Sequence, residues 1–238
     1  MTIVNSSRDF TVRTPVGAHG FRPAVRIQES VLADGERDLL TFLCRNLPAW
    51  VTPDALTAVG VCGAVVTALG YVGSNLSPVF LFVASFGLLV NWFGDSLDGS
   101  LARYRGVERH RYGFFLDHSM DAASNLIIAI GLGLSPYVDM GASLFTLVGY
   151  LLLGLSVFLN SHVSGKFRLS FLGFGPTELR LVMVAFNLVV YILGPVEVRL
   201  LGQIYSLHSL SVAALGLFLV GLFLINVNRT ARDLAHQG

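Results

Sequence analysis

The chain has 238 residues, of which 53 % are hydrophobic and only 13 % are charged, and its mean hydropathy is +0.67. That charged fraction is about half of what soluble globular domains carry. A body of this size cannot keep so much apolar surface away from water. The composition therefore excludes a soluble domain, a disordered chain and a fibrous repeat, and it predicts a membrane protein.

The first part of the chain, residues 1–50, is predicted to be a cytoplasmic tail followed by an amphipathic helix over 29–47. Apolar side chains recur there at mostly helical spacing, with charged residues between them, at Leu32, Leu39, Leu40, Leu43 and Leu47. This pattern is typical of a helix that lies on the inner membrane surface. A helix packed on the cytoplasmic end of a bundle is the alternative.

Six later segments are candidates for crossing the membrane, which takes about 20 apolar residues. Gly and Pro residues lie at the breaks between them, as expected at helix ends. The segments are 56–72, 78–102, 112–135, 142–162, 177–193 and 207–227. The sequence therefore predicts an all-α fold: a six-transmembrane-helix bundle over 51–230, followed by a cytoplasmic tail over 231–238.

Positive charges are unevenly distributed between the predicted loops. With the N-terminus inside, only Arg199 of the 16 Lys and Arg residues falls on the outer side. By the positive-inside rule, both termini should be cytoplasmic, and a bacterial inner membrane is the expected location. The inner loops are expected to form a basic rim, which attraction to the inner leaflet explains, from Arg105, Arg109, His110, Arg111, Lys166 and Arg168.

Four aspartates lie at the cytoplasmic ends of two predicted spans. Asp95 and Asp98 are three residues apart near the end of the second span, and Asp117 and Asp121 are four apart at the start of the third. Each pair therefore shares one helix face. Four facing carboxylates repel one another, and oxygen-only ligands suit a hard divalent cation such as Mg²⁺, Mn²⁺ or Ca²⁺, of which they can hold two. Helix-end solvation or pairing with nearby arginines is the alternative.

These aspartates belong to a longer pattern that continues through a short basic loop. The chain reads Asp95-x2-Asp98-Gly99-x2-Ala102-Arg103, then nine residues, then Gly113-x3-Asp117-x3-Asp121. This resembles the signature of the CDP-alcohol phosphotransferase (phosphatidyltransferase) family, and all eight fixed positions match. The six-span layout is similar to that family as well, so the resemblance covers roughly residues 50–230.

The resemblance implies an enzyme that moves a substituted phosphoryl group from a CDP-linked donor to an alcohol or lipid acceptor, with release of CMP, in phospholipid or related lipid synthesis. The four aspartates match carboxylates that hold two divalent cations, Mg²⁺ or Mn²⁺, and Asp121 matches a residue often assigned as the base. Gly99, Ala102 and Arg103 match positions around the cytidine diphosphate, and Gly113 is the second motif glycine. A homodimer in contact with membrane lipids is also implied, and no nucleic-acid partner is expected.

Two features resemble one branch of the family, the choline and ethanolamine phosphotransferases. His118 directly follows Asp117, and Thr177-Glu178 is similar to a Thr-Glu pair of that branch. The resemblance makes His118 and Glu178 candidates for proton transfer, although a histidine at a helix start can also be a solvated or capping residue. These features favour a CDP-aminoalcohol donor and a lipid acceptor. The alternative is phosphatidyl transfer from CDP-diacylglycerol to a small polar alcohol.

The start of the first span offers one more candidate. Asp54 occupies the place of an Asn in a Pro-Asn-x-Leu/Ile-Thr element common in the family, so it is a candidate residue for the nucleotide site. Ordinary helix-start chemistry, with Thr52 as the cap and Pro53 in the first turn, explains the same residues.

A divalent-cation transporter is the alternative from another functional class, because intramembrane aspartates also line ion paths. A transporter predicts acidic residues through the depth of the membrane. Here they gather on one side, and only Asp139 and Glu197 fall on the far side.

Overall fold

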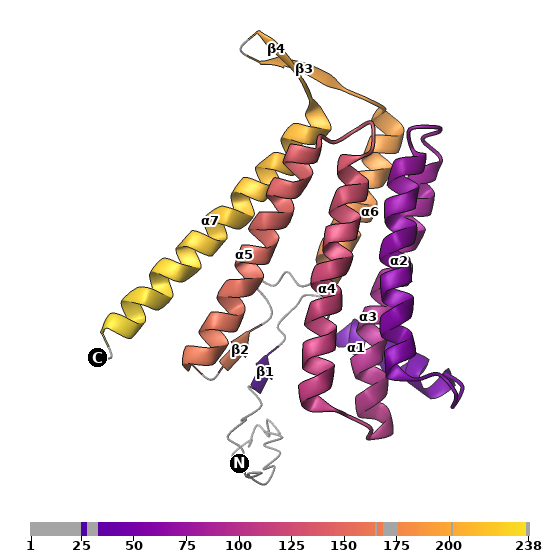
Figure 1. The fold of residues 1–238 in the computed structure, drawn as a ribbon, viewed down its shortest axis with the longest axis vertical. Coiled ribbons are helices and arrows are strands. Elements are labelled where there is room, and N and C mark those ends of the chain that lie inside the picture. The colour runs from indigo at the N-terminus through magenta and orange to yellow at the C-terminus, as the bar shows by residue number, and fades with distance from the viewer. Residues whose placement is uncertain (1–24, 28–32, 165, 169–175, 201, 237–238) are drawn as a thin grey trace, which may run out of the picture.

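The computed structural model describes residues 25–27, 33–164, 166–168, 176–200 and 202–236. The described residues form seven α-helices and two small sheets (Figure 1). In chain order these are β1 (Val25–Ile27), α1 (Ala33–Asn46), α2 (Pro53–Gly73), α3 (Phe80–Arg105), α4 (His110–Gly133), α5 (Met140–Ser164), β2 (Lys166–Arg168), α6 (Pro176–Leu193), β3 (Glu197–Leu200), β4 (Gln203–Ser206) and α7 (Leu207–Ala235). The predicted all-α class is confirmed.

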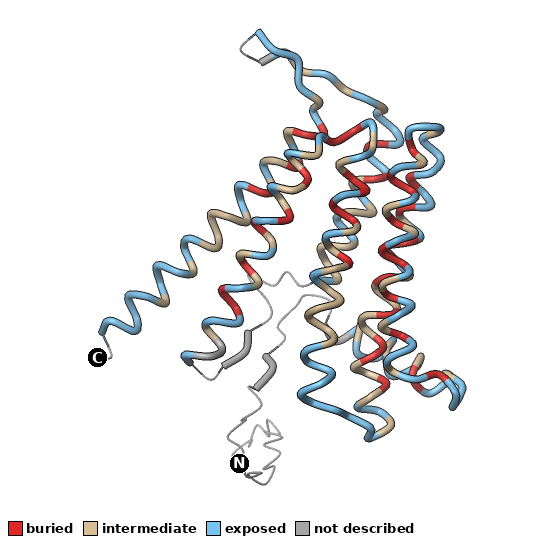
Figure 2. Tube along the Cα trace, viewed as in Figure 1, coloured by how far each residue is buried: buried red, intermediate tan, exposed pale blue. Residues whose placement is uncertain are grey.

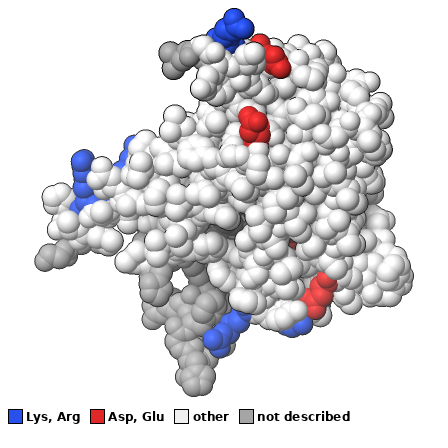
Figure 3. All heavy atoms as spheres, turned by 45° about the horizontal axis from the view of Figure 1, so that its top comes forward, with Lys and Arg blue, Asp and Glu red and all other residues white. Residues whose placement is uncertain are grey.

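Among the described residues, five helices are long and apolar enough to cross a membrane by length and composition: α2, α3, α5, α6 and α7. Helix α4 has the length of a span, but Arg111, Asp117 and Asp121 lie in its first half. The protein is therefore an integral, multi-pass membrane protein, and the crossing by α4 stays a prediction. On the face in Figure 3, most charged side chains lie toward the top, left and bottom, and most of the surface between them is uncharged.

Helices α2 and α3 pack backbone against backbone along most of their length, because glycines line the contact. A Cβ on Gly94 would lie 2.3 Å from the backbone nitrogen of Gly60, and one on Gly70 would lie 2.4 Å from that of Ala84. Small residues allow this close approach in membranes, where packing and not hydrophobicity holds helices together. The contact fixes the height of the Asp95 turn of α3 against α2.

Helix α2 also holds α4. A Cβ on Gly131 of α4 would lie 2.4 Å from the Cα of Ala68. Helices α3 and α4 contact each other very little, whereas each packs extensively on α2. Helix α2 is therefore the common support that places the acidic residues of α3 and α4 relative to each other.

Of the remaining spans, α6 lies with α2, α3 and α4, while α5 and α7 form the other side of the molecule (Figure 1). Helix α6 packs on α3, and α5 packs mainly on α7 (Figure 1). The buried residues of α7 all lie in its first half, between His208 and Gly216, and most of its second half is exposed (Figure 2). The helix runs without a break to Ala235, beyond the predicted end of the membrane domain at residue 230.

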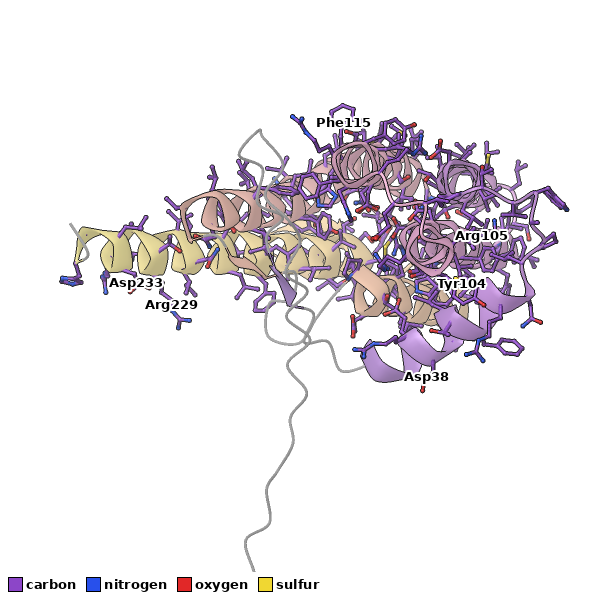
Figure 4. All side chains as sticks on the ribbon, turned by 90° about the horizontal axis from the view of Figure 1, so that it is seen from below. Asp38, Tyr104, Arg105, Phe115, Arg229 and Asp233 are labelled. Atoms are coloured by element: carbon purple, nitrogen blue, oxygen red, sulfur yellow. The ribbon has the colours of Figure 1, made fainter. Side chains whose placement is uncertain are left out.

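Helix α1 runs across the end of the bundle, so that Figure 4 shows it from the side while α2, α3 and α4 are seen nearly end-on. Cys44 is buried and clusters with Leu97 and Leu101 of α3, while Phe42 is 62 % exposed. The helix is thus amphipathic, as predicted, and its apolar side partly packs on the bundle, as the alternative expected. Residues 29–32 of the predicted helix lie outside the described residues.

Two short sheets accompany the helices. Strand β1 pairs with β2 in parallel, and β3 pairs with β4 as an antiparallel hairpin with Leu200 opposite Gln203. Gly202 precedes β4 with a positive φ of 84°, which glycine adopts without strain. Neither sheet is predicted from the sequence, because strands of three or four residues contain too few alternations to stand out. The β3–β4 hairpin lies at the end of the bundle opposite the α3–α4 turn (Figure 1).

Candidate active site

The centre of the candidate site is a group of three carboxylates from two helices. Asp95 of α3 and Asp117 and Asp121 of α4 each offer one oxygen, and these oxygens all lie within 4.8 Å of one another. The three residues are half-buried. The structure thus brings together three of the four aspartates that the sequence singles out, and we call these three the acid cluster.

Asp98, the fourth aspartate, does not join this group within the same distance. It is 8 % exposed, and its Oδ2 accepts a hydrogen bond of 2.6 Å from Oγ1 of Thr57 on α2. Its Oδ1 accepts from the backbone N–H of Gly99. Asp98 is therefore held by helix α2 and by its own turn, one helical turn below Asp95.

Arg180 of α6 contacts the acid cluster from a third helix. Its Nη2 lies 2.8 Å from Oδ2 of Asp95 and 4.0 Å from Oδ1 of Asp121. Its Nε donates to Oδ1 of Asn91 (2.9 Å), and Asn91 in turn donates to the carbonyl of Gly60 (2.9 Å). From the sequence, Arg180 is only one of the cations expected on the cytoplasmic side. An arginine close behind Thr177-Glu178 in an apolar span is the signal that could have identified it.

His118 lies on α4 beside the acid cluster. Its Nδ1 is 3.0 Å from Oδ2 of Asp117. The imidazole packs between two phenyl rings, with centroid distances of 4.3 Å to Phe114 and 4.9 Å to Phe158. Glu178 lies in the first turn of α6, two residues before Arg180, with one carboxylate oxygen buried.

The motif residues expected around a nucleotide follow on the last turns of α3 and the first turn of α4. Gly99 and Ala102 are half-buried, and Arg103 donates a hydrogen bond of 3.1 Å to Oγ of Ser100. A Cβ on Gly99 would lie 3.4 Å from Nη1 of Arg103, whereas one on Gly113 would meet nothing within 4 Å. The glycines therefore leave room near the guanidinium and at the open start of α4.

Asp54 and the predicted basic rim are connected. The carboxylate of Asp54 pairs with Arg109, whose guanidinium also lies 4.1 Å from the ring centre of Tyr112. Arg105, at the end of α3 (Figure 4), donates instead to backbone carbonyls between α1 and α2, including those of Pro48 and Val51. Arg105 therefore holds this linker, and it does not act simply as an exposed cation of the rim.

Two small hollows meet at Asp121. The first lies among α2, α3 and α4 and includes Thr57 and the acid cluster in its lining. The second lies among α3, α4, α5 and α6, and apolar side chains such as Leu88, Ile128 and Met183 line it together with the polar Arg180, Asn125 and Tyr150. Asp121 thus stands between a hollow that contains the acid cluster and one with a mixed apolar and polar lining.

Comparison with known sequences gives a consistent picture. The family model described as CDP-alcohol phosphatidyltransferase matches residues 50–227. Cholinephosphotransferase 1 of Danio rerio is 26 % identical over 162 residues, which are 64 % of this chain and 40 % of the relative. Phosphatidylinositol phosphate synthase of Cutibacterium acnes is 38 % identical over 94 residues, covering 37 % of this chain and 40 % of the relative. Archaetidylinositol phosphate synthase of Pyrococcus horikoshii is 31 % identical over 99 residues, covering 42 % and 50 %. The chain thus spans half or less of the length of these relatives.

Proposed function

Because the chain belongs to the CDP-alcohol phosphatidyltransferase family, we propose that it transfers a substituted phosphoryl group from a CDP-linked donor to an alcohol hydroxyl and releases CMP. The observation that carries this proposal is the acid cluster, in which carboxylates from two motif-bearing helices converge within 4.8 Å. Clustered carboxylates beside apolar spans are energetically unfavourable, and in membrane proteins such groups mark functional sites.

The donor atoms of the acid cluster fit divalent cations. The three carboxylates, with Asp98 one turn away on α3, offer only oxygens, which Mg²⁺ and Mn²⁺ prefer. In the proposal, Asp95, Asp98, Asp117 and Asp121 hold two such cations. When bound, the cations would neutralise the diphosphate and stabilise the charge that develops on the leaving CMP.

The donor's cytidine diphosphate is proposed to lie along Gly99, Ala102, Arg103 and Gly113, with Asp54 nearby. The glycines permit close approach of a ligand to the backbone, and the Arg103 guanidinium supplies positive charge for the phosphates. Asp54 is already paired with Arg109, so its contribution to the nucleotide site is through the position of that arginine.

Three residues are candidates for taking the proton of the acceptor hydroxyl: His118, Asp121 and Glu178. A carboxylate that binds a metal is a poor base, because the cation stabilises its charged form. A neutral imidazole suits the task better at neutral pH. His118 Nδ1 lies 3.0 Å from Oδ2 of Asp117, which places the imidazole beside the acid cluster, so we assign the base to His118.

For the substrates, we favour a CDP-aminoalcohol donor and a lipid acceptor. His118 and the Thr177-Glu178 pair support this choice, as does the similarity to cholinephosphotransferase 1. Phosphatidyl transfer from CDP-diacylglycerol to a small polar alcohol is the second candidate. The higher identity to phosphatidylinositol phosphate synthase, over a shorter stretch, favours it.

A panel of substrates tests both candidates. Purified protein is incubated with Mg²⁺ or Mn²⁺ and either CDP-choline or CDP-ethanolamine plus diacylglycerol, or CDP-diacylglycerol plus small polyols and their phosphates. CMP release is followed in each case. We expect release with the first set, whereas release only with the second selects the phosphatidyl donor. No release with any pair contradicts the proposed function.

The same proposal places both termini and the acid cluster on the cytoplasmic side of a bacterial inner membrane. Helix α7 ends at the same end of the bundle as the α3–α4 turn, which carries the basic loop (Figure 1). Arg229 and Asp233, near that end of α7, are labelled in Figure 4. The homodimer stays a prediction.

A further inference from the structure

We propose that Glu36 of α1 is a positioning residue, which fixes the first turn of α6 and thereby Arg180 against the acid cluster. The inference rests on the proposed transfer reaction but not on which donor is used. Helix α1 precedes the residues that the family model matches, so Glu36 lies outside the matched part of the chain.

One carboxylate oxygen of Glu36 accepts hydrogen bonds from three donors on two other helices. Oε1 lies 2.8 Å from Oγ1 of Thr177 on α6, 3.1 Å from Nε1 of Trp92 and 3.3 Å from Oγ of Ser96, both on α3. Hydrogen bonds to a charged acceptor are stronger than neutral ones. The half-buried Glu36 therefore ties three helices at one point, whereas Asp38 on the same helix points outward (Figure 4).

The donors of Glu36 are close in sequence to both partners of the Arg180–Asp95 ion pair. Ser96 directly follows Asp95, and Thr177 precedes Arg180 by three residues, which is about one turn of helix. A shift of the α6 start relative to α3 therefore moves Arg180 relative to Asp95. Misplacement of a reacting group by about 1 Å can cost on the order of 10²-fold in rate.

The type of residue fits this position. Thr177 is the second residue of α6, so the Glu36 carboxylate lies at the N-terminal end of that helix. Negative charge is favourable there, because the helix dipole and the unpaired N–H groups present positive potential. A neutral side chain would lose both the dipole interaction and the strength of the three hydrogen bonds.

The test compares Glu36→Ala, Glu36→Gln, Thr177→Val and the double variant Glu36→Ala/Thr177→Val in the full-length protein. Asp38→Asn is the matched control, because it removes an outward-pointing carboxylate from the same helix. CMP release, measured at a temperature well below the Tm of each variant, gives kcat and donor KM. Hydrogen exchange reports on the amides of residues 180–184 of α6. The exchange measurement needs no substrate.

We expect Glu36→Ala and Thr177→Val each to lower kcat about tenfold, the size expected when a charge-assisted hydrogen bond is lost, and to speed exchange in α6. The kcat of the double variant should be about that of the slower single variant, because the Glu36–Thr177 contact is already lost in either one. Glu36→Gln, which keeps an acceptor oxygen, should recover part of the rate, and Asp38→Asn should match wild type.

The proposal is overturned if Glu36→Ala leaves exchange in α6 unchanged, if kcat per folded molecule stays at the wild-type value, or if the two substitutions multiply. A purely structural role would lower Tm and leave kcat intact. If wild type releases no CMP from any donor, the proposed function fails, and exchange alone decides the coupling: faster exchange in both single variants supports it, and unchanged exchange overturns it.

Discussion

Arg180 of α6 donates a hydrogen bond of 2.8 Å to the carboxylate of Asp95 on α3, although 85 residues separate them in the chain. The Arg180 side chain is 13 % exposed, and its Nη2 also lies 4.0 Å from Oδ1 of Asp121. A positive charge thus sits at the edge of the acid cluster and offsets part of the repulsion between its carboxylates. This relationship makes the cluster a three-helix arrangement, with α6 added to the two helices that carry the motif.

Replacing Arg180 by Ala should make the protein more dependent on divalent cations for stability. Loss of one partner from a partly buried ion pair leaves repelling carboxylates uncompensated, at a cost of up to about 3 kcal/mol. We expect Tm in EDTA to fall, and Mg²⁺ or Mn²⁺ to raise Tm by more degrees than in wild type. Thermal unfolding in detergent with and without the cation measures this. If the cation raises Tm equally in wild type and in Arg180→Ala, Arg180 does not help to offset the repulsion between the carboxylates.

Asp98→Asn should abolish CMP release and leave the protein folded in detergent. The amide oxygen can still accept the hydrogen bond from Thr57, which keeps the link between α2 and α3, while the bond from the Gly99 N–H and the charge for metal binding are lost. The exposed Asp139, which precedes α5, offers a matched control, because Asp139→Asn removes a distant charge. Retained activity of Asp98→Asn at saturating Mg²⁺ and Mn²⁺ would refute the assignment of Asp98 to metal binding.

His118→Ala should lower kcat by about 10²–10⁴-fold, the usual contribution of one acid–base group, with little change in donor KM. Asp121→Asn should instead weaken metal binding and catalysis together. Steady-state kinetics over a range of Mn²⁺ concentrations separates the two. Near-wild-type turnover of His118→Ala would move the proton to Asp121, Glu178 or water. A phosphatidyl donor would then become the better proposal.

The α3–α4 turn should be cytoplasmic. A cysteine at Val107, which is 53 % exposed, should resist an impermeant thiol reagent added outside intact cells. A cysteine at Gln203, in the hairpin at the opposite end, should be labelled readily. Both are made with Cys62 replaced, while Cys44 can remain, because burial raises the pKa of its thiol and slows its reaction. Labelling of position 107 and protection of position 203 would reverse the topology.

Gly94→Ala should destabilise the α2–α3 pair by about 1–3 kcal/mol or more, because its Cβ would lie 2.3 Å from the backbone nitrogen of Gly60. The helices must move apart, and Asp95 and Asp98 move with them, so activity should fall as well. Gly154→Ala in α5 is the matched control, since its Cβ would meet nothing within 4 Å. Tm in detergent compares the two variants. A Gly94→Ala protein as stable as wild type would contradict backbone-to-backbone packing.

Local features of the sequence were enough to predict the helices and the acidic motif. Span length and apolar content depend on residues that are neighbours in the chain, so α2 to α7 begin and end within a few residues of the predicted spans. The exception is the C-terminal end of α7, which lies at Ala235 and not at 227. The i,i+3 and i,i+4 spacings likewise place each aspartate pair on one helix face. The order of motif residues was sufficient to identify the family.

The tertiary structure decided which side chains meet. The sequence groups all four aspartates alike, yet α2 takes Asp98 through Thr57 while Asp95 joins the acid cluster. The sequence alone did not predict the contact between Arg180 and Asp95, nor that between Glu36 and Thr177, which are 141 residues apart. These contacts depend on how far each helix slides along its neighbour. Between α2 and its neighbours α3 and α4, that distance is set by glycines packing against another helix's backbone, and for every pair it is a property of two surfaces together that no single segment contains.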